Sequence, residues 1–141
     1  MNSEFAVSVH ALVFLNHHYK EIKTSEEISE NICINPARAR KILSKLKKAG
    51  LVNTKEGSVK GGYSFTLDAA KITLLDVYQA IGKRVIDISW RSGNVNMECL
   101  IASGMGDIMD EVYEKLDDVC KEELSKITIT DIDSKIFKNG E

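Results

Sequence analysis

The sequence has few cysteines, almost no proline and no long apolar run. Its longest uninterrupted apolar run is Ala11 to Leu15, which is too short to cross a bilayer. No basic segment of the kind that begins a secretory signal stands at the N-terminus. The three cysteines, Cys33, Cys99 and Cys120, are widely spaced, so they predict no disulfide scaffold and indicate a reducing, cytoplasmic environment. The single proline and nine glycines exclude a collagen-like or low-complexity chain.

The composition is that of a globular domain, with 43% hydrophobic and 28% charged residues in a chain of 141. The net charge is only −2, but it is unevenly spread. Residues 1–67 hold 10 Lys/Arg and 6 Asp/Glu, whereas residues 68–141 hold 9 and 15. Between Arg38 and Lys60 there are eight basic residues against Glu56 alone. This block predicts a face that binds an anion, above all nucleic acid; a solvated helix face is the alternative.

The first segment reads as a helix over residues 3–18. Its spacing predicts an inward face of Phe5, Val9, Leu12 and Leu15. Adjacent histidines such as His17 and His18 project about 100° apart on a helix, so they do not easily share one ion. We expect no metal site here.

Two short helices joined by a tight turn follow. Thr24 with Glu27 forms a capping box at the start of one helix, and Ser25 as the cap is the alternative. Asn35 and Pro36 begin the next, and Gly50 ends it. Basic residues occupy its outer side, and the inward residues are Ala39, Ile42, Leu43 and Leu46. This arrangement is typical of a helix-turn-helix.

A β-hairpin comes directly after these helices. Residues 51–55 and 63–67 have strand composition and flank a turn-rich tip that carries Lys60. A helix-turn-helix followed by a hairpin is a winged helix, although a plain hairpin with a solubilising lysine is the alternative. We predict arginine contacts to base edges and lysine contacts to phosphates. The predicted DNA-binding residues are Thr24, Ser25, Asn35, Ala37, Arg38, Arg40, Lys41, Lys45, Lys48 and Lys60.

Beyond the hairpin, a helix capped by Thr73 ends at Gly82, and a linker follows in which Trp90 is expected to be a packing anchor. Residues 96–125 predict one long helix. Its apolar stripe is wider than that of an ordinary surface helix, which favours pairing with a second copy over packing within the monomer. The predicted dimer interface is Ile101, Met105, Ile108, Val112, Leu116 and Val119.

The C-terminal segment reads as a link into a short helix capped by Thr128 or Thr130, docked on the long helix. The predicted fold is mostly α with a small β-hairpin. We divide it into a winged helix-turn-helix DNA-binding domain (1–82), a linker (83–95), and a dimerisation helix with the C-terminal segment (96–141).

Four short motifs, taken together, resemble the sequences of one protein family, and the resemblance covers nearly the whole chain. They are TSEEI at 24–28, LKKAGLV at 46–52, GGY at 61–63 and ITLLDV at 72–77. Their combination resembles the bacterial winged-helix regulators typified by the repressors IscR, NsrR and CymR. The resemblance implies a homodimer that forms through a long dimerisation helix. It also implies that this homodimer is a transcriptional repressor.

The chain departs from that family pattern in three places. The family's wing often begins with Arg-Gly, but residues 56–60 depart from that, and we expect Lys60 to take over the phosphate contact. Arg38 and Arg40 stand where the family often has tyrosine and glutamate, which implies a different operator. Iron–sulfur members carry three cysteines at six-residue steps, but around Cys99 those positions hold Gly93 and Met105. A cluster needs three or four thiolates, so we expect no cofactor, and we expect Cys33 and Cys120 to be small buried hydrophobes.

Cys99 lies where the linker enters the long helix. A helix N-terminus lowers a thiol pKa, which makes Cys99 a candidate thiol sensor; a buried apolar role is the alternative. No nucleophile elbow, phosphate loop or metal-spaced set is present, so we predict that the chain is not an enzyme. The predicted function is a homodimeric repressor with an unidentified small-molecule or protein effector. The alternative is a winged-helix protein-interaction module.

Overall fold

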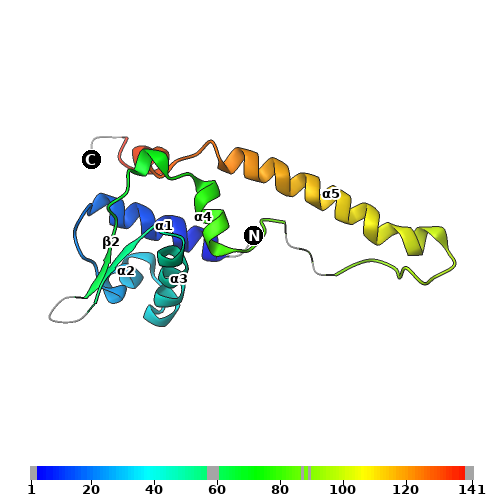
Figure 1. The fold of residues 1–141 in the computed structure, drawn as a ribbon, viewed down its shortest axis with the longest axis horizontal. Coiled ribbons are helices and arrows are strands. Elements are labelled where there is room, and N and C mark those ends of the chain that lie inside the picture. Colours follow the sequence, from blue (N-terminus) through cyan, green and yellow to red (C-terminus); the bar gives the residue numbers. More distant parts are fainter. Residues whose placement is uncertain (1–2, 57–60, 87, 89, 139–141) are drawn as a thin grey trace.

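A computed structural model describes residues 3–56, 61–86, 88 and 90–138. A helical body carries a two-stranded hairpin, and one long helix extends from it as an arm (Figure 1). The prediction of a winged helix with a long C-terminal helix is confirmed. In chain order the elements are α1 (Ser3–His17), α2 (Ser25–Ile32), α3 (Pro36–Lys48), β1 (Asn53–Lys55), β2 (Gly62–Ser64), η1 (Ala69–Lys71), α4 (Leu74–Ile81), α5 (Leu100–Leu124) and α6 (Ile129–Ile136).

Helix α1 is the centre of the body and contacts α2, α3, α4 and α6. It is apolar on nearly all sides, which is typical of a buried helix. Leu12 and Leu15 are fully buried, as predicted. Phe5 and Val9 also pack against the core, but they are only partly buried. A helix that is surrounded by neighbours has no single inward stripe, so its periodicity does not show which side is most covered.

The inward face of α3 agrees with the sequence. Ala39, Ile42, Leu43 and Leu46 are each at most 1% exposed. They pack with residues of α1, α2 and α4 in one hydrophobic core. This packing fixes the rotation of α3 about its own axis, so its basic side faces outward.

Side-chain caps set the turn between α2 and α3. Thr24 and Glu27 form the predicted capping box, in which the Glu27 backbone N–H donates to Thr24 Oγ1 at 3.1 Å. Cys33 ends α2 in the left-handed conformation, with φ 66° and ψ 46°. The Asn35 side chain then accepts from the Ala37 backbone N–H at 2.7 Å and starts α3. Local chemistry therefore explains both helix boundaries.

The hairpin is tied to the start of α2. β1 and β2 are antiparallel, with Thr54 opposite Tyr63. Tyr63 also exchanges two backbone hydrogen bonds of 2.8 Å with Lys23, just before α2. Gly62 makes this approach possible, because a Cβ there would lie 2.5 Å from the Lys23 carbonyl oxygen. The wing is thereby held beside the helix-turn-helix.

The C-terminal helix α6 returns to the body. Thr128 caps it, and Thr128 forms an antiparallel bridge with Thr73, the cap of α4. Ile129 is fully buried in the core. The predicted docking on the long helix was wrong, because α6 packs on α1 and η1 instead. Backbone pairing between residues distant in sequence decides this placement, and periodicity does not show it.

The linker that leads to the arm starts at the end of α4, and α5 returns to contact α4. Asp117 of α5 is 1% exposed and accepts a 2.8 Å hydrogen bond from the Tyr78 hydroxyl. In the linker between α4 and α5, Trp90 is 76% exposed, so the expected packing anchor was wrong for the single chain. No helix in the described part of the chain is long and apolar enough to span a bilayer.

Candidate nucleic-acid interface

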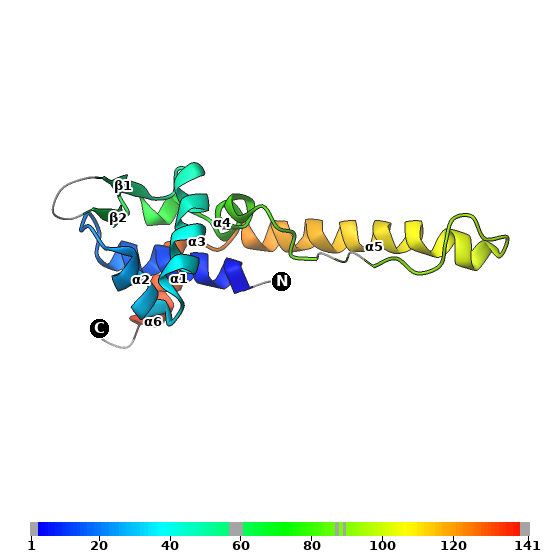
Figure 2. The same cartoon turned by 90° about the horizontal axis from the view of Figure 1, so that it is seen from below.

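Helix α2, helix α3 and the wing meet around a polar groove. Its volume is about 400 Å³. The floor and walls come from the start of α2, the outer side of α3 and both strands of the hairpin. The lining residues are Thr24, Ser25, Glu26, Ser44, Lys47, Thr54, Lys55, Glu56, Gly61, Gly62 and Tyr63. Two predicted site residues, Thr24 and Ser25, are therefore brought together with the wing. Figure 2 shows α2, α3 and the hairpin grouped in the body, with α5 extending away from them.

The outermost side of α3 is polar and basic. Ala37, Lys41, Ser44 and Lys48 recur at three- and four-residue steps, opposite the buried stripe, and all four are exposed. Among the residues that the structure describes, none covers this stripe, so it forms an outward-facing polar surface. Three of these residues were predicted from the sequence, and Ser44 was missed.

Arg40 flanks that stripe on the side of α2. Its Nη1 lies 3.4 Å from Ser25 Oγ and 3.6 Å from a Glu26 carboxylate oxygen. Half of the Arg40 side chain is exposed. These contacts hold the guanidinium beside Ser25 and Glu26, two residues that line the groove. A guanidinium has five N–H donors, so it can keep Ser25 and still bind a base or phosphate.

Arg38 and Lys45 lie on the other flank, toward α1. Arg38 donates to the Ser3 hydroxyl. Lys45 forms an ion pair with Glu4 at 3.1 Å, and Lys83 lies 3.7 Å from the same carboxylate. The hydrogen bond from Lys45 is the main cause that holds the pKa of Glu4 below its usual value. These two predicted contacts are therefore engaged within the body and are separate from the groove.

The groove also contains residues that were not predicted as contacts from the sequence, among them Ser44, Lys47 and Lys55. Lys47 and Lys55 belong to the basic block and flank the Ala-Gly-Leu-Val turn. Their position between a recognition helix and a wing was a signal that could have identified them. The predicted contact Lys60 lies outside the described residues.

The predicted dimer face is exposed in the single chain. Ile101 is 76% exposed, Ile108 57%, Val112 41% and Val119 64%. Met105 and Leu116 lie on the same face, at 37% and 47%. Folding of one chain therefore leaves an apolar stripe uncovered along a helix of 25 residues, which spans about 38 Å.

Two cysteines are more exposed to solvent than the sequence predicted. Cys33 is exposed and Cys120 is half-buried, so that prediction was wrong. Cys99 is also exposed and is the N-cap of α5. Backbone N–H groups of Ala102 and Ile101 lower the pKa of the Cys99 thiol. A helix N-terminus offers such donors because its first N–H groups have no partner within the helix.

The donor set at Cys99 does not fit an iron–sulfur cluster. Cys33 is the C-cap of α2 and Cys120 lies near the end of α5, so Cys99 is the only one of the three thiols at the start of α5. Within the described part of the chain, no three His, Cys, Asp or Glu side chains are grouped to hold a metal ion. A cluster would need further thiolates.

Comparison with known proteins gives consistent matches over nearly the full length. YwnA of Bacillus subtilis (strain 168), which carries the name HTH-type transcriptional regulator, is 29% identical over 97% of this chain and 99% of its own. The crystal structure of a transcriptional regulator from Lactobacillus plantarum has a TM-score of 0.84 and 24% identity, covering 99% of this chain and 93% of that one. T. potens IscR has a TM-score of 0.72 and 18% identity, covering 100% and 90%.

The model of one protein family matches residues 1–134. That match includes the helix-turn-helix, the wing, the arm and most of α6. The resemblance found in the sequence motifs is thereby confirmed. The chain belongs to the family described as Rrf2, iron-dependent transcriptional regulator.

Proposed function

We propose that this transcriptional regulator is a homodimeric repressor that binds a pseudo-palindromic operator through α3 and the wing. The observation that carries the proposal is the groove in which the start of α2, the polar side of α3 and the hairpin converge. It supplies hydroxyl, ammonium and backbone groups of the kind that bind phosphates beside a helix that can read bases.

The basic residues of α3 and the wing divide into three groups in this proposal. Arg40 and Lys41 reach the major groove from the outer side, where arginine can bind guanine through two hydrogen bonds. Lys48 and Lys60 contact phosphates. Arg38 and Lys45 contact DNA only after leaving Ser3 and Glu4, so their substitution has a smaller effect on binding.

The second chain covers the exposed stripe of α5. Burial of Ile101, Ile108, Val112 and Val119 against the same face of a partner removes apolar area from water, at about 25 cal/mol per Å². Two-fold symmetry then repeats α3 on the second body. For binding to one face of DNA, the two α3 helices must lie about one turn apart, ~34–36 Å.

Salt dependence separates this proposal from a protein-interaction module. DNA duplexes selected from a random pool are titrated at several salt concentrations, and binding is followed by fluorescence anisotropy. Release of phosphate counterions should give a steep fall of affinity with salt. Arg40→Ala should cost about 1–3 kcal/mol and relax sequence preference, whereas Lys135→Ala on α6 should change neither. A flat salt response would favour the protein-interaction module.

We also propose that the regulator works without an iron–sulfur cluster and that the Cys99 thiol responds to oxidants. The exposed N-cap position and the lowered pKa of Cys99 support this. Peroxide should weaken operator binding by the wild type but not by Cys99→Ser. Equal sensitivity of the two proteins contradicts the sensor role, and iron–sulfur absorbance in protein purified without oxygen contradicts the absence of a cluster.

A further inference from the structure

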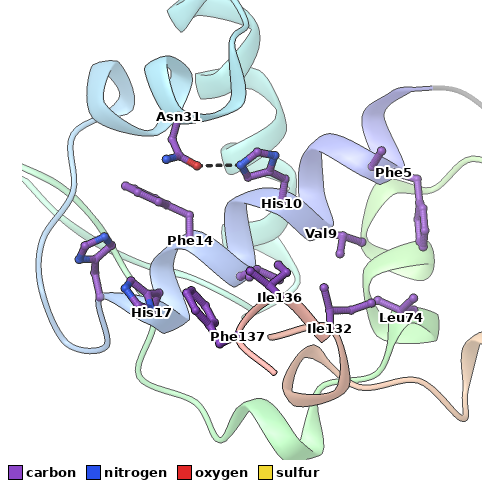
Figure 3. A pocket seen from close by; sticks show the side chains of 13 residues that line it. Phe5, Val9, His10, Phe14, His17, Asn31, Leu74, Ile132, Ile136 and Phe137 are labelled. Atoms are coloured by element: carbon purple, nitrogen blue, oxygen red, sulfur yellow. Dashed lines mark hydrogen bonds between the residues drawn. The ribbon is translucent and has the colours of Figure 1, made fainter. Parts of the chain in front are cut away.

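A second cavity shares no lining residue with the groove described above. Its volume is about 600 Å³, between α1, the end of α2 and α6 (Figure 3). Apolar side chains form most of its wall. Two of them, Phe5 and Val9 on α1, were predicted from the periodicity to face inward. The principal apolar lining residues are Phe5, Val9, Phe14, Ile132, Ile136 and Phe137.

Aromatic rings give one end of this cavity flat walls. The rings of His17 and Phe137 stack, with centroids 4.8 Å apart and planes 12° from parallel. The ring of Phe14 meets His18 edge to face at 4.8 Å. Such surfaces favour a flat, apolar occupant, because aromatic rings pack best in offset-stacked or edge-to-face contacts.

A polar pair stands in the wall of the cavity. His10 Nε2 donates to Asn31 Oδ1 at 2.7 Å, across the space between α1 and α2 (Figure 3). Because the Asn31 oxygen accepts this bond, the Asn31 amide N–H groups are available as donors. Among the described residues that line the cavity, none is acidic or carries a lysine or arginine side chain. The polar feature is therefore suited to a hydrogen-bond acceptor.

We propose that this cavity binds a small, flat, mostly apolar molecule that carries one hydrogen-bond-accepting group. Its volume is within the usual ~300–1,000 Å³ of small-molecule sites, and the lining has the usual pattern of apolar walls with few polar groups. The apolar part of the ligand contacts Phe5, Val9 and Ile136, and its acceptor binds the Asn31 amide.

The site is placed to regulate DNA binding, an inference that rests on the proposed function. Its walls come from α1 and α2 of the DNA-binding body and from α6, which follows the arm directly. A ligand that changes the distance between α1 and α6 moves the point where α5 joins the body. In a dimer, this changes the separation of the two α3 helices.

The test uses the fluorescent probe 1-anilinonaphthalene-8-sulfonate, which joins flat apolar rings to an accepting sulfonate, with the full-length protein. Ile136 is 58% exposed at the wall of the cavity, so Ile136→Trp adds volume without disturbing the core. This substitution should weaken binding at least about tenfold, or 1.4 kcal/mol. The matched control Lys135→Trp adds the same ring at an exposed position of the same helix outside the lining and should leave affinity within about twofold.

The polar part of the proposal has its own test. Asn31→Asp replaces the amide donor with a carboxylate and should weaken the sulfonate probe about tenfold or more. It should leave the neutral analogue N-phenyl-1-naphthylamine within about twofold. Equal binding of the sulfonate probe by wild type, Ile136→Trp and Asn31→Asp overturns the proposal.

Two other outcomes also overturn it. Failure of the wild type to bind either probe shows that the cavity is no ligand site. Probe binding that rises as the protein dissociates on dilution, measured by sedimentation, shows that a second copy of the chain covers the cavity. Probe affinity is measured on the protein alone, so a failure of DNA binding leaves this result intact.

Discussion

Replacement of Asp117 by alanine tests the attachment of the arm to the body. The Asp117 carboxylate is 1% exposed, and the Tyr78 hydroxyl donates to it at 2.8 Å. Lys121 Nζ lies 3.2 Å and Arg84 Nη2 3.6 Å from its other oxygen. A hydrogen bond to a charged group contributes about 1.5–3 kcal/mol. Because Lys121 and Arg84 are about half exposed, their ion pairs add only about 0.2–1 kcal/mol each.

These terms give an expected loss of about 2–5 kcal/mol in the free energy of unfolding for Asp117→Ala. For a chain of this size, the melting temperature should fall by roughly 6–18 °C. Thermal unfolding is measured at one fixed protein concentration, because dimerisation makes the melting temperature depend on concentration. The matched control is Asp118→Ala at the exposed neighbouring position, which should change the melting temperature by no more than about 2 °C.

Acidification supplies a second measurement on the same residue. Burial acts to raise the pKa of Asp117, but hydrogen bonds from Tyr78 and Lys121 and the charges of Lys121 and Arg84 outweigh it, so the pKa is held below its usual value. The ionised carboxylate therefore stabilises the folded state at pH values above the unfolded pKa of about 3.9. This contribution is lost as the pH falls through the lower pKa of the folded state.

The difference in stability between wild type and Asp117→Ala should consequently be constant near neutral pH and decrease below about pH 4. A double-mutant cycle with Tyr78→Phe should give a coupling energy above about 1 kcal/mol. If Asp117→Ala and Asp118→Ala unfold at the same temperature, or if the coupling is near zero, the reasoning about this contact is refuted.

Three further predictions concern other parts of the chain. Val112→Asp places a charge on the exposed α5 stripe and should convert dimers to monomers in sedimentation; an unchanged dimer would place the interface elsewhere. Cys33→Gly should stabilise the protein by about 0.5–1 kcal/mol in urea unfolding, because φ is 66° at this residue; a loss of stability would contradict that strain. Gly62→Ala should cost more than about 1 kcal/mol and speed hydrogen exchange at the Tyr63 amide, because its Cβ would lie 2.5 Å from the Lys23 oxygen; an unchanged exchange rate would show that the wing adapts.

The parts of the fold that depend on local chemistry could be predicted from the sequence. Asn35 and Pro36 start α3 where they were expected to, and Thr73 caps α4. Cap and turn residues act on backbone groups two or three positions away, so the sequence contains the whole interaction. The long helix was placed from residue 96, but it begins at Leu100, because the chain folds back and the Asn94 backbone N–H donates to the Ala102 carbonyl oxygen.

The candidate site was predictable only in outline. The basic side of α3 can be predicted, because it lies opposite the apolar stripe. Which of its basic residues form contacts within the body depends on residues distant in sequence. Lys45 pairs with Glu4 across 41 positions, and no local pattern contains that contact. The ligand cavity was missed for a similar reason, since α1 and α6 meet only after the whole chain has folded.

The attachment of the arm has a consequence for how operators of different length can be accommodated. The Val85 backbone N–H donates to the Tyr78 hydroxyl at 3.3 Å, and the same hydroxyl donates to Asp117. The chain therefore leaves the body at Val85 and returns to it at Asp117, and Tyr78 contacts both residues. The residues between them can be lengthened or shortened without moving these two points. Seven residues added within α5 lengthen it by about 10.5 Å and return the apolar stripe to nearly the same face. In the proposed dimer, the distance between half-sites can thus change through insertions and deletions in the arm, while the core and the DNA-reading surface keep their sequence.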